Sequence, residues 1–140
     1  MVAKAMKPSK DNRKKFDIDL AYGEVMEDMV ADMFQKKKIE VKSEKGLWHN
    51  TGNIVIEYES WGKPSGIEAT EADYWFHNLS LGDDLYVTLA FEVAGLKRII
   101  ANNKFRSVQG GDHKASRMWL IPLKKLFEQE TFEAFRSGKA

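Results

Sequence analysis

Residues 38–60, which read KIEVKSEKGLWHNTGNIVIEYES, decide the fold of this chain. Apolar and polar side chains alternate near both ends of this stretch, and alternation with a period of two is typical of β-strands. We therefore expect one strand over residues 38–44 and a second over residues 53–60. Residues 46–52, with a glycine at each end, are expected to form the loop or hairpin connection between them.

Working outward from these strands, helical and strand patterns alternate along the chain. The apolar side chains of residues 18–36 recur at helical spacing, which leaves Glu27 at the edge of the apolar face and turns Glu24 away from it. The other expected elements are a turn-rich loop at 61–69, a helix at 71–78, a buried strand at 85–91, a helix at 94–102, a loop at 109–113, an edge strand at 118–121 and a helix at 123–136. This order predicts an α/β fold with a mixed sheet flanked by helices.

The composition is that of a globular protein without disulfide bonds. The chain has 140 residues, 43% of them hydrophobic and 31% charged, and its length fits one domain. It has no cysteine, which excludes disulfides and cysteine-based zinc sites and is compatible with a reducing cytoplasm. No apolar run reaches the length of a membrane helix, so no membrane partner is expected. We expect a basic arm over residues 1–15, able to contact phosphates or simply solvated, and a single domain over residues 16–140.

The acids of the two strands carry the functional interpretation. Glu57 and Glu59 are expected on one strand face, about 6–7 Å apart, where they could hold a divalent cation between them. Glu44 from the neighbouring strand and Glu27 from the first helix could converge on the same point, and Lys42 shares a strand face with Glu44. The alternative is a solvated strand face at the edge of a sheet.

These residues give the chain its resemblance to a known superfamily. Glu27 on a first helix, Glu44 at a strand end and Glu57-Tyr-Glu59 on the next strand resemble the arrangement of the PD-(D/E)xK nucleases. Residues 16–127 are similar to a phage and bacterial nuclease-like group in the phrases Ile39-Glu-Val-Lys42, Thr51-Gly-Asn-Ile-Val-Ile-Glu57-Tyr-Glu59, Ser65-Gly-Ile, Thr70-x-Ala72-Asp73-Tyr-Trp75 and Gly110-Gly-Asp112.

The resemblance implies a restriction-endonuclease-like fold and hydrolysis of DNA with Mg²⁺ or Mn²⁺. It implies that Glu44, Glu57 and Glu59 are metal ligands, that Glu27 supports the site and that Lys42 stabilises charge. Two positions depart from the family: Glu44 stands where an aspartate is usual, and Glu59 stands where a lysine is usual. A rival register, ranked second, takes Glu40-Val-Lys42 as the acid-x-lysine motif itself.

Several residues outside the acid cluster could contact DNA. Lys36, Lys37 and Lys38 could touch phosphates or form a solvated loop, and His49 lies in the connection between the two strands. Trp48 in the same connection could stack on a base or anchor the loop. The three histidines show no metal-ligand spacing, which argues against a zinc site.

Three hypotheses of different classes follow. The first is a DNA endonuclease, structure-selective and acting as a homodimer, which would be encoded by a phage and work in the host cytoplasm. The second is a degenerate nuclease fold that binds DNA without cutting it, with Glu59 as the inactivating change. The third is a structural or interaction protein of a phage.

Overall fold

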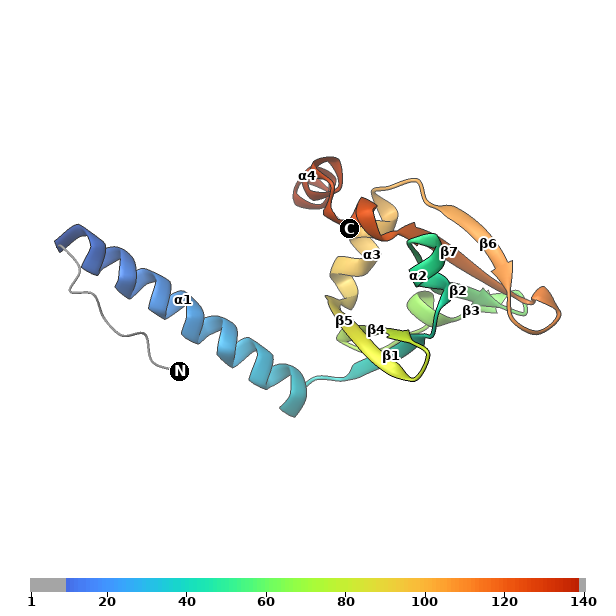
Figure 1. The fold of residues 1–140 in the computed structure, drawn as a ribbon, viewed down its shortest axis with the longest axis horizontal. Helices are drawn as coiled ribbons and strands as arrows, with labels where there is room; N and C mark the ends of the chain where they lie inside the picture. The colour runs from blue at the N-terminus through green and yellow to red at the C-terminus, as the bar shows by residue number, and fades with distance from the viewer. Residues whose placement is uncertain (1–9, 139–140) are drawn as a thin grey trace. The chain divides into compact units, whose positions relative to one another are not determined.

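The computed structural model describes residues 10–138 and divides the chain into two compact units, Met1–Lys37 and Lys38–Ala140. The described part of the first unit is helix α1 (Lys10–Gln35), shown in Figure 1. The helix expected from residue 18 is confirmed and begins earlier, so the last part of the expected basic arm is helical and residues 1–9 lie outside the described residues. No described helix is long and apolar enough to cross a membrane.

The second unit, called the sheet unit below, holds all the described strands. Its helices and strands are β1 (Ile39–Glu44), α2 (Leu47–Thr51), β2 (Asn53–Ser60), β3 (Lys63–Pro64), β4 (Tyr74–Leu81), β5 (Asp84–Glu92), α3 (Val93–Ala101), β6 (Arg106–Gly110), β7 (Ser116–Pro122) and α4 (Gln129–Ser137). Short 3-10 turns occupy Gly66–Glu68, Asp112–Lys114 and Leu123–Phe127. The strands expected at 38–44 and 53–60 and the helix expected at 94–102 are confirmed as β1, β2 and α3.

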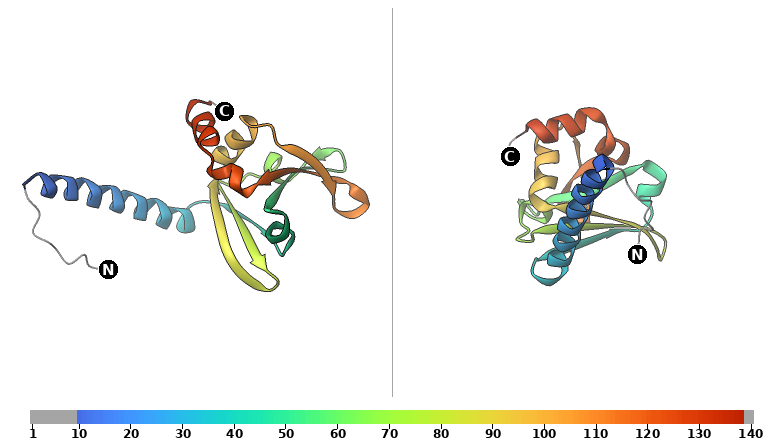
Figure 2. Two further views of the ribbon diagram at one scale, coloured as in Figure 1. Left: turned by 45° about the horizontal axis from the view of Figure 1, so that its top comes forward. Right: turned by 90° about the vertical axis from the view of Figure 1, so that its left-hand side faces the viewer.

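The strands form two sheets rather than the expected single one. The first sheet has the order β1-β4-β5, with β1 parallel to β4 and β4 antiparallel to β5. The second has the order β3-β2-β7-β6 and is antiparallel throughout. The turns β4–β5 and β6–β7 point in different directions (Figure 2). The α/β class is therefore confirmed, but only the first sheet is mixed.

Helix α2 explains why β1 and β2 do not pair as a hairpin. It stands where a loop was expected, and its Trp48 is buried with the indole Nε1–H donating to the carbonyl of Ser80 at 2.7 Å. Gly52 ends the helix in the left-handed conformation that glycine adopts most easily (φ 76°). The chain therefore leaves α2 beside the second sheet, where β2 pairs with β7.

Alternating residues of both sheets form one core. Ile54, Ile56 and Ile121 of the second sheet are fully buried, as are Trp75 of the first sheet and Leu96 of α3. Because successive strand residues point to opposite faces, the same strands present Glu57 and Val55 on their other side. The core thus fixes the strand that carries the candidate acids.

Two segments that were expected to be helical differ in the structure. The expected helix at 71–78 is wrong, because this segment belongs largely to β4, where Trp75, His77 and Leu79 are buried at alternate positions. An aromatic-rich run with a buried residue at every second position suits a pleated strand better than a helix. The expected helix at 123–136 is broken at Glu128, whose extended backbone separates a 3-10 turn from α4.

Two strands also differ from their expected places in the sheets. Strand β7 was expected at an edge but lies between β2 and β6, because β6, which was not expected, covers its other side. Pro122 still ends β7, as its missing N–H requires. Strand β5 was expected to be buried, yet its first four residues, from Asp84 to Val87, are exposed at an edge of the first sheet.

Candidate carboxylate site

A hollow of about 180 Å³ in the sheet unit is lined by residues from four strands, and the charged side chains among them are Lys42, Glu44 and Glu57. It is lined by Lys42, Ser43 and Glu44 of β1, Val55 and Glu57 of β2, Trp75 and His77 of β4, and Met118 of β7. Three of the expected site residues, Lys42, Glu44 and Glu57, therefore meet in one place. Lys42 and Glu44 share a face of β1, as the alternation predicted.

A buried hydrogen-bond chain holds Glu44. The indole Nε1–H of Trp75 donates to Nδ1 of His77 at 3.1 Å, and Nε2 of His77 lies 2.5 Å from Oε2 of Glu44. An indole N–H can only donate, so Nδ1 must accept and the ring proton of His77 lies on Nε2. The His77 side chain is 2% exposed and that of Glu44 is 14% exposed, so the chain is shielded from water.

Glu44 also joins the two sheets. Its Oε2 accepts a second hydrogen bond from the backbone N–H of Val55 at 3.0 Å. Both bonds use the same oxygen, and Oε1 has no hydrogen-bond partner among the described residues. One oxygen of this carboxylate is thus fixed by the protein while the other is left for a ligand or solvent.

Glu57 is held in a comparable way from the other sheet. Ser65 donates its hydroxyl to Oε2 of Glu57 at 2.8 Å, and the Ser65 N–H donates to the carbonyl of Tyr58 at 3.0 Å. Gly66 makes this close approach feasible: it has φ +51°, and a Cβ built there would lie 2.0 Å from the Glu57 carbonyl oxygen. Only glycine fits such a position without displacing the backbone.

Glu59 does not lie beside Glu57 as expected. The pairing of β2 with β7 shifts between these two residues, so Glu57 lies opposite Met118 and Glu59 opposite Arg117. Because Arg117 and Met118 are consecutive and point to opposite faces, their partners do as well. Glu59 accordingly pairs with Arg117, with its Oε2 3.2 Å from the arginine Nε, and is not among the residues that line the hollow.

Lys42 brings a positive charge to the hollow. Its Nζ lies 3.6 Å from Oε2 of Glu40 and 6.0 Å from the ring centre of Trp75. Glu40, the acid of the rival register, accepts a hydrogen bond from Thr70 at 3.1 Å and lines a separate hollow with it. Glu44 and Glu57 thus share a hollow that Glu40 does not line, and both registers stay predictions.

The remaining expected residues lie elsewhere. Glu27 is exposed on α1 of the first unit, so the site described here consists of sheet-unit residues alone. Residues 36–38 and His49 are exposed, which leaves their expected role as DNA contacts a prediction. Trp48 is only 8% exposed, so of the two alternatives it is the loop anchor rather than a base-stacking residue.

The donor set of the hollow suits a hard divalent cation. Over residues 10–138 no group of three or more acids, histidines or cysteines is placed to hold a metal ion. Two carboxylates are nevertheless within the usual number for Mg²⁺, which keeps several waters and takes one or two protein carboxylates with substrate phosphate. Glu44 and Glu57 each have one carboxylate oxygen without a hydrogen-bond partner among residues 10–138, and their other oxygens accept hydrogen bonds from donors of the kind that support metal ligands.

Two residues of this site were not expected, His77 and Ser65. His77 lies in a segment for which the sequence predicts a helix, and only the pairing of β4 with β1 places it opposite Lys42. Ser65 precedes a glycine in a turn-rich loop, but only the fold of the Pro64–Gly66 turn brings it to Glu57.

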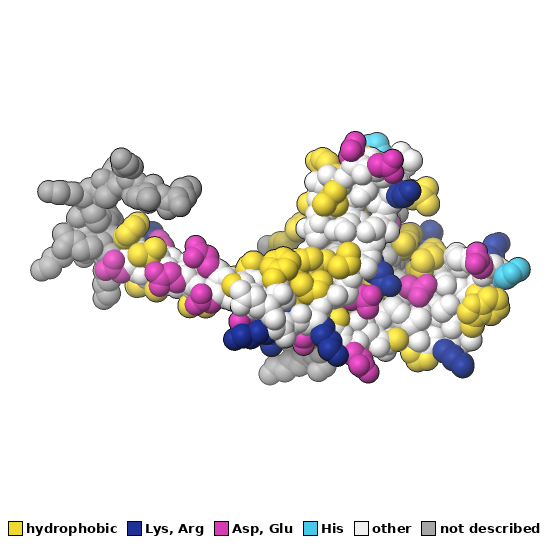
Figure 3. Space-filling view, turned by 90° about the horizontal axis from the view of Figure 1, so that it is seen from below, with side chains coloured by type: hydrophobic (Ala, Val, Ile, Leu, Met, Phe, Trp, Pro, Cys, Tyr) yellow, Lys and Arg dark blue, Asp and Glu magenta, His cyan; other side chains and the backbone are white. Residues whose placement is uncertain are grey.

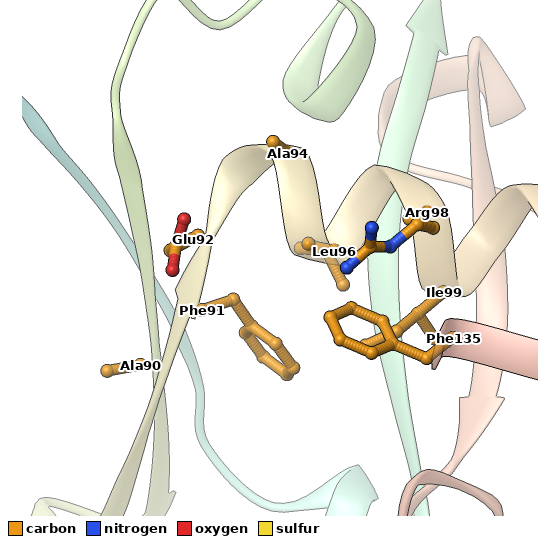
Figure 4. Close-up of a pocket in the computed structure, with 9 residues that line it drawn as sticks. Ala90, Phe91, Glu92, Ala94, Leu96, Arg98, Ile99 and Phe135 are labelled. Carbon is orange, nitrogen blue, oxygen red and sulfur yellow. The ribbon is translucent and has the colours of Figure 1, made fainter. Parts of the chain in front are cut away.

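A second, larger hollow of about 430 Å³ lies between the end of β5, α3 and Phe135 of α4 (Figure 4). Its lining is mainly apolar, and the guanidinium of Arg98 lies 3.9 Å from the centre of the Phe135 ring. Glu92 is the one acid in this lining, so the hollow offers no pair of carboxylates. The smaller hollow is therefore the better candidate for metal chemistry, despite its size.

Comparison with known protein families, with curated proteins and with solved structures finds no match to this chain. The resemblance to the PD-(D/E)xK nucleases thus stays a prediction. The homodimer and the cytoplasmic, phage-encoded setting stay predictions as well.

Proposed function

We propose that the sheet unit hydrolyses phosphodiester bonds of DNA with Mg²⁺ or Mn²⁺ held by Glu44 and Glu57. The observation that carries this proposal is that two carboxylates from different sheets line one hollow with Lys42, each fixed through Oε2. The two carboxylates could hold a metal ion, and the ammonium group of Lys42 lies in the same hollow. Both positive charges would stabilise the negative charge that develops on a phosphate ester when it is attacked.

Each residue of the hollow has a distinct role in this proposal. Glu44 and Glu57 would hold the cation, while His77 and Ser65 keep the two carboxylates in place. Lys42 places its ammonium group against the phosphate and offsets developing charge. A bound cation would supply an activated water and further charge neutralisation.

The second candidate is a DNA-binding protein with the same fold and no cleavage. One observation favours it: Glu59, expected as a third ligand, pairs with Arg117 on the other side of β2. With two carboxylates instead of three, the cation would depend more on water and on the substrate for its coordination shell.

The test compares cleavage by the full chain and by two matched variants. Supercoiled, single-stranded and branched DNA are incubated with Mn²⁺ or with EDTA, using the native chain, Glu57→Gln and Glu59→Gln. We expect metal-dependent cleavage that falls by about 100-fold or more in Glu57→Gln, because several kcal/mol of charge stabilisation depend on the metal. Glu59→Gln should stay within about threefold of the native chain, since its carboxylate pairs with an exposed arginine.

The other outcomes separate the candidates. DNA binding without cleavage of any substrate would support the second candidate. An equal loss of cleavage in both variants would contradict the assignment of Glu57, rather than Glu59, to the metal.

A further inference from the structure

Two turns lie side by side at one end of the second sheet. The turn between β2 and β3 contains Trp61, and the turn between β6 and β7 contains the 3-10 segment Asp112–Lys114. The Trp61 N–H donates to the carbonyl of Ala115 at 3.0 Å, and the hydroxyls of Ser60 and Ser116 lie 3.4 Å apart. These bonds hold the two turns together as one surface.

Both turns contain residues in an unfavourable backbone conformation. Trp61, His113 and Lys114 have φ values of 52°, 55° and 54°, and they are the non-glycine residues with positive φ in the described part of the chain. Such values are unusual for residues with a side chain, and strained backbone of this kind gathers at functional positions. Trp61 is also 68% exposed, so burial of its large ring does not offset the strain.

The exposed side chains of the two turns include aromatic and basic groups, and also the acid Asp112. The rings of Trp61 and His113 lie 6.1 Å apart at an angle of 55°. Lys63 and Lys114 are exposed, and within residues 10–138 no acid forms an ion pair with either of them. Hydrophobic, histidine and basic side chains gather at this end of the sheet unit, with an acidic side chain beside them, on the right in Figure 3. We call Trp61, Lys63, His113 and Lys114 the tryptophan surface.

We propose that the tryptophan surface stacks on an unpaired base of DNA, which makes single-stranded or branched DNA the substrate class. This inference rests on the proposed function, because it takes DNA as the partner. Bases inside a duplex are already stacked on both sides, whereas an unpaired base gains a stacking partner from an exposed indole. Lys63 and Lys114 would meet the backbone phosphates on either side of that base.

The position of the tryptophan surface suits a DNA strand that also reaches the carboxylate hollow. Trp61 follows Glu57 by four residues at the end of β2, which is roughly 13 Å along a strand. That distance corresponds to about four base steps of 3.4 Å. On this spacing, a DNA strand with a base stacked on Trp61 would have a phosphate at the distance of Glu57 a few nucleotides away.

The turn between β4 and β5 offers a matched contrast. Beside this turn, Tyr86 of β5 is exposed to the same extent, at 69%, and its neighbours Asp83 and Asp84 are acidic. Two carboxylates here repel phosphates, whereas Asp112 of the other surface is accompanied by Lys63 and Lys114, so Tyr86 is not expected to contact DNA. Tyr86→Ala is thus a control for the loss of an exposed aromatic ring.

The test measures binding without metal, so that it does not depend on cleavage. Fluorescence anisotropy with labelled 12-nucleotide oligo-dT and a labelled 12-base-pair duplex, in EDTA at low salt, compares the native chain with Trp61→Ala, Trp61→Phe and Tyr86→Ala. We expect Trp61→Ala to weaken binding of oligo-dT about tenfold and Trp61→Phe to restore most of it. Binding of the duplex by all variants, and of oligo-dT by Tyr86→Ala, should stay within about twofold of the native chain.

Three results would overturn the inference: no binding of oligo-dT by the native chain, unchanged binding in Trp61→Ala, or an equal loss for duplex and oligo-dT. Unchanged thermal unfolding of Trp61→Ala would exclude a folding defect. If the alanine variant is unstable, binding of oligo-dT by Trp61→Phe tests the inference instead. Metal-dependent cleavage with unchanged binding in Trp61→Ala would contradict this inference alone. Selective loss of oligo-dT binding without any cleavage by the native chain would contradict the nuclease proposal alone.

Discussion

Glu57 and Glu59 lie two residues apart on β2, but on opposite faces and in different surroundings. Glu57 faces the hollow, where Ser65 holds its carboxylate beside Glu44 and Lys42. Glu59 faces the other side and pairs with Arg117, in contact with solvent. One shift in the pairing with β7 separates them. A single irregularity in a strand can thus decide which acid of a Glu-x-Glu motif is available for chemistry.

The largest effect should come from Gly66, which supports the Glu57 face. Gly66→Ala would place a Cβ 2.0 Å from the Glu57 carbonyl oxygen at a backbone with φ +51°. Because the clash is with backbone and the conformation is strained, we expect a loss of about 3 kcal/mol in the free energy of unfolding, measured by urea denaturation.

Gly62→Ala is the matched control for this prediction. Gly62 also has positive φ (74°) but has no atom within 4 Å of a built Cβ. We expect it to cost about 1 kcal/mol, from the backbone conformation alone. Equal losses in the two variants would show that the close approach of Gly66 to Glu57 contributes nothing.

A smaller loss in the free energy of unfolding should follow when the hydrogen bonds from Trp75 through His77 to Glu44 are interrupted. His77→Phe keeps a ring in the buried position but leaves the Trp75 N–H without its acceptor and removes one of the two donors to Glu44. An unsatisfied buried group costs about 1–3 kcal/mol, so we expect about 2 kcal/mol by thermal or urea unfolding.

His113→Phe tests the same change at an exposed histidine. His113 forms no hydrogen bond through its ring with any described residue, and we expect its replacement to alter stability by about 0.5 kcal/mol or less. If His77→Phe were equally mild, the buried chain would not be what holds Glu44.

The smallest effect is expected on the face of Glu59. Arg117→Ala removes an ion pair whose side chains are 52% and 35% exposed. Exposed ion pairs contribute little, so the free energy of unfolding should fall by about 0.5 kcal/mol, with no loss of metal-dependent cleavage. A large loss of cleavage in this variant would mean that Arg117 or Glu59 takes part in the site after all.

The local pattern of the sequence predicted the strands but not their partners. Alternation was sufficient for β1 and β2, because each buries one face, and helical spacing was sufficient for α3. Alternation cannot say which strand pairs with which, so the parallel pairing of β1 with β4 and the division into two sheets were not foreseen. Residues 74–81 form a strand rather than a helix because Trp75, His77 and Leu79 are buried at every second position.

The sequence likewise predicted part of the candidate site but not its supporting contacts. Glu44, Glu57 and Lys42 do line one hollow, since strand faces follow directly from the alternation. The departure of Glu59 depends on a pairing shift that no residue type marks, and the supporting roles of His77 and Ser65 depend on long-range contacts. Alternation therefore located the acids, whereas their hydrogen-bond partners required the tertiary structure.

The order of the strands has a consequence for how the molecule is made. The chain supplies β1 to the first sheet, β2 and β3 to the second, β4 and β5 to the first, and β6 and β7 to the second. On a ribosome, β1 must wait for β4, and β2 must wait for β7. Neither sheet can be completed before the other begins, so the strands that carry Glu44 and Glu57 reach their final pairing only after β7 has been synthesised.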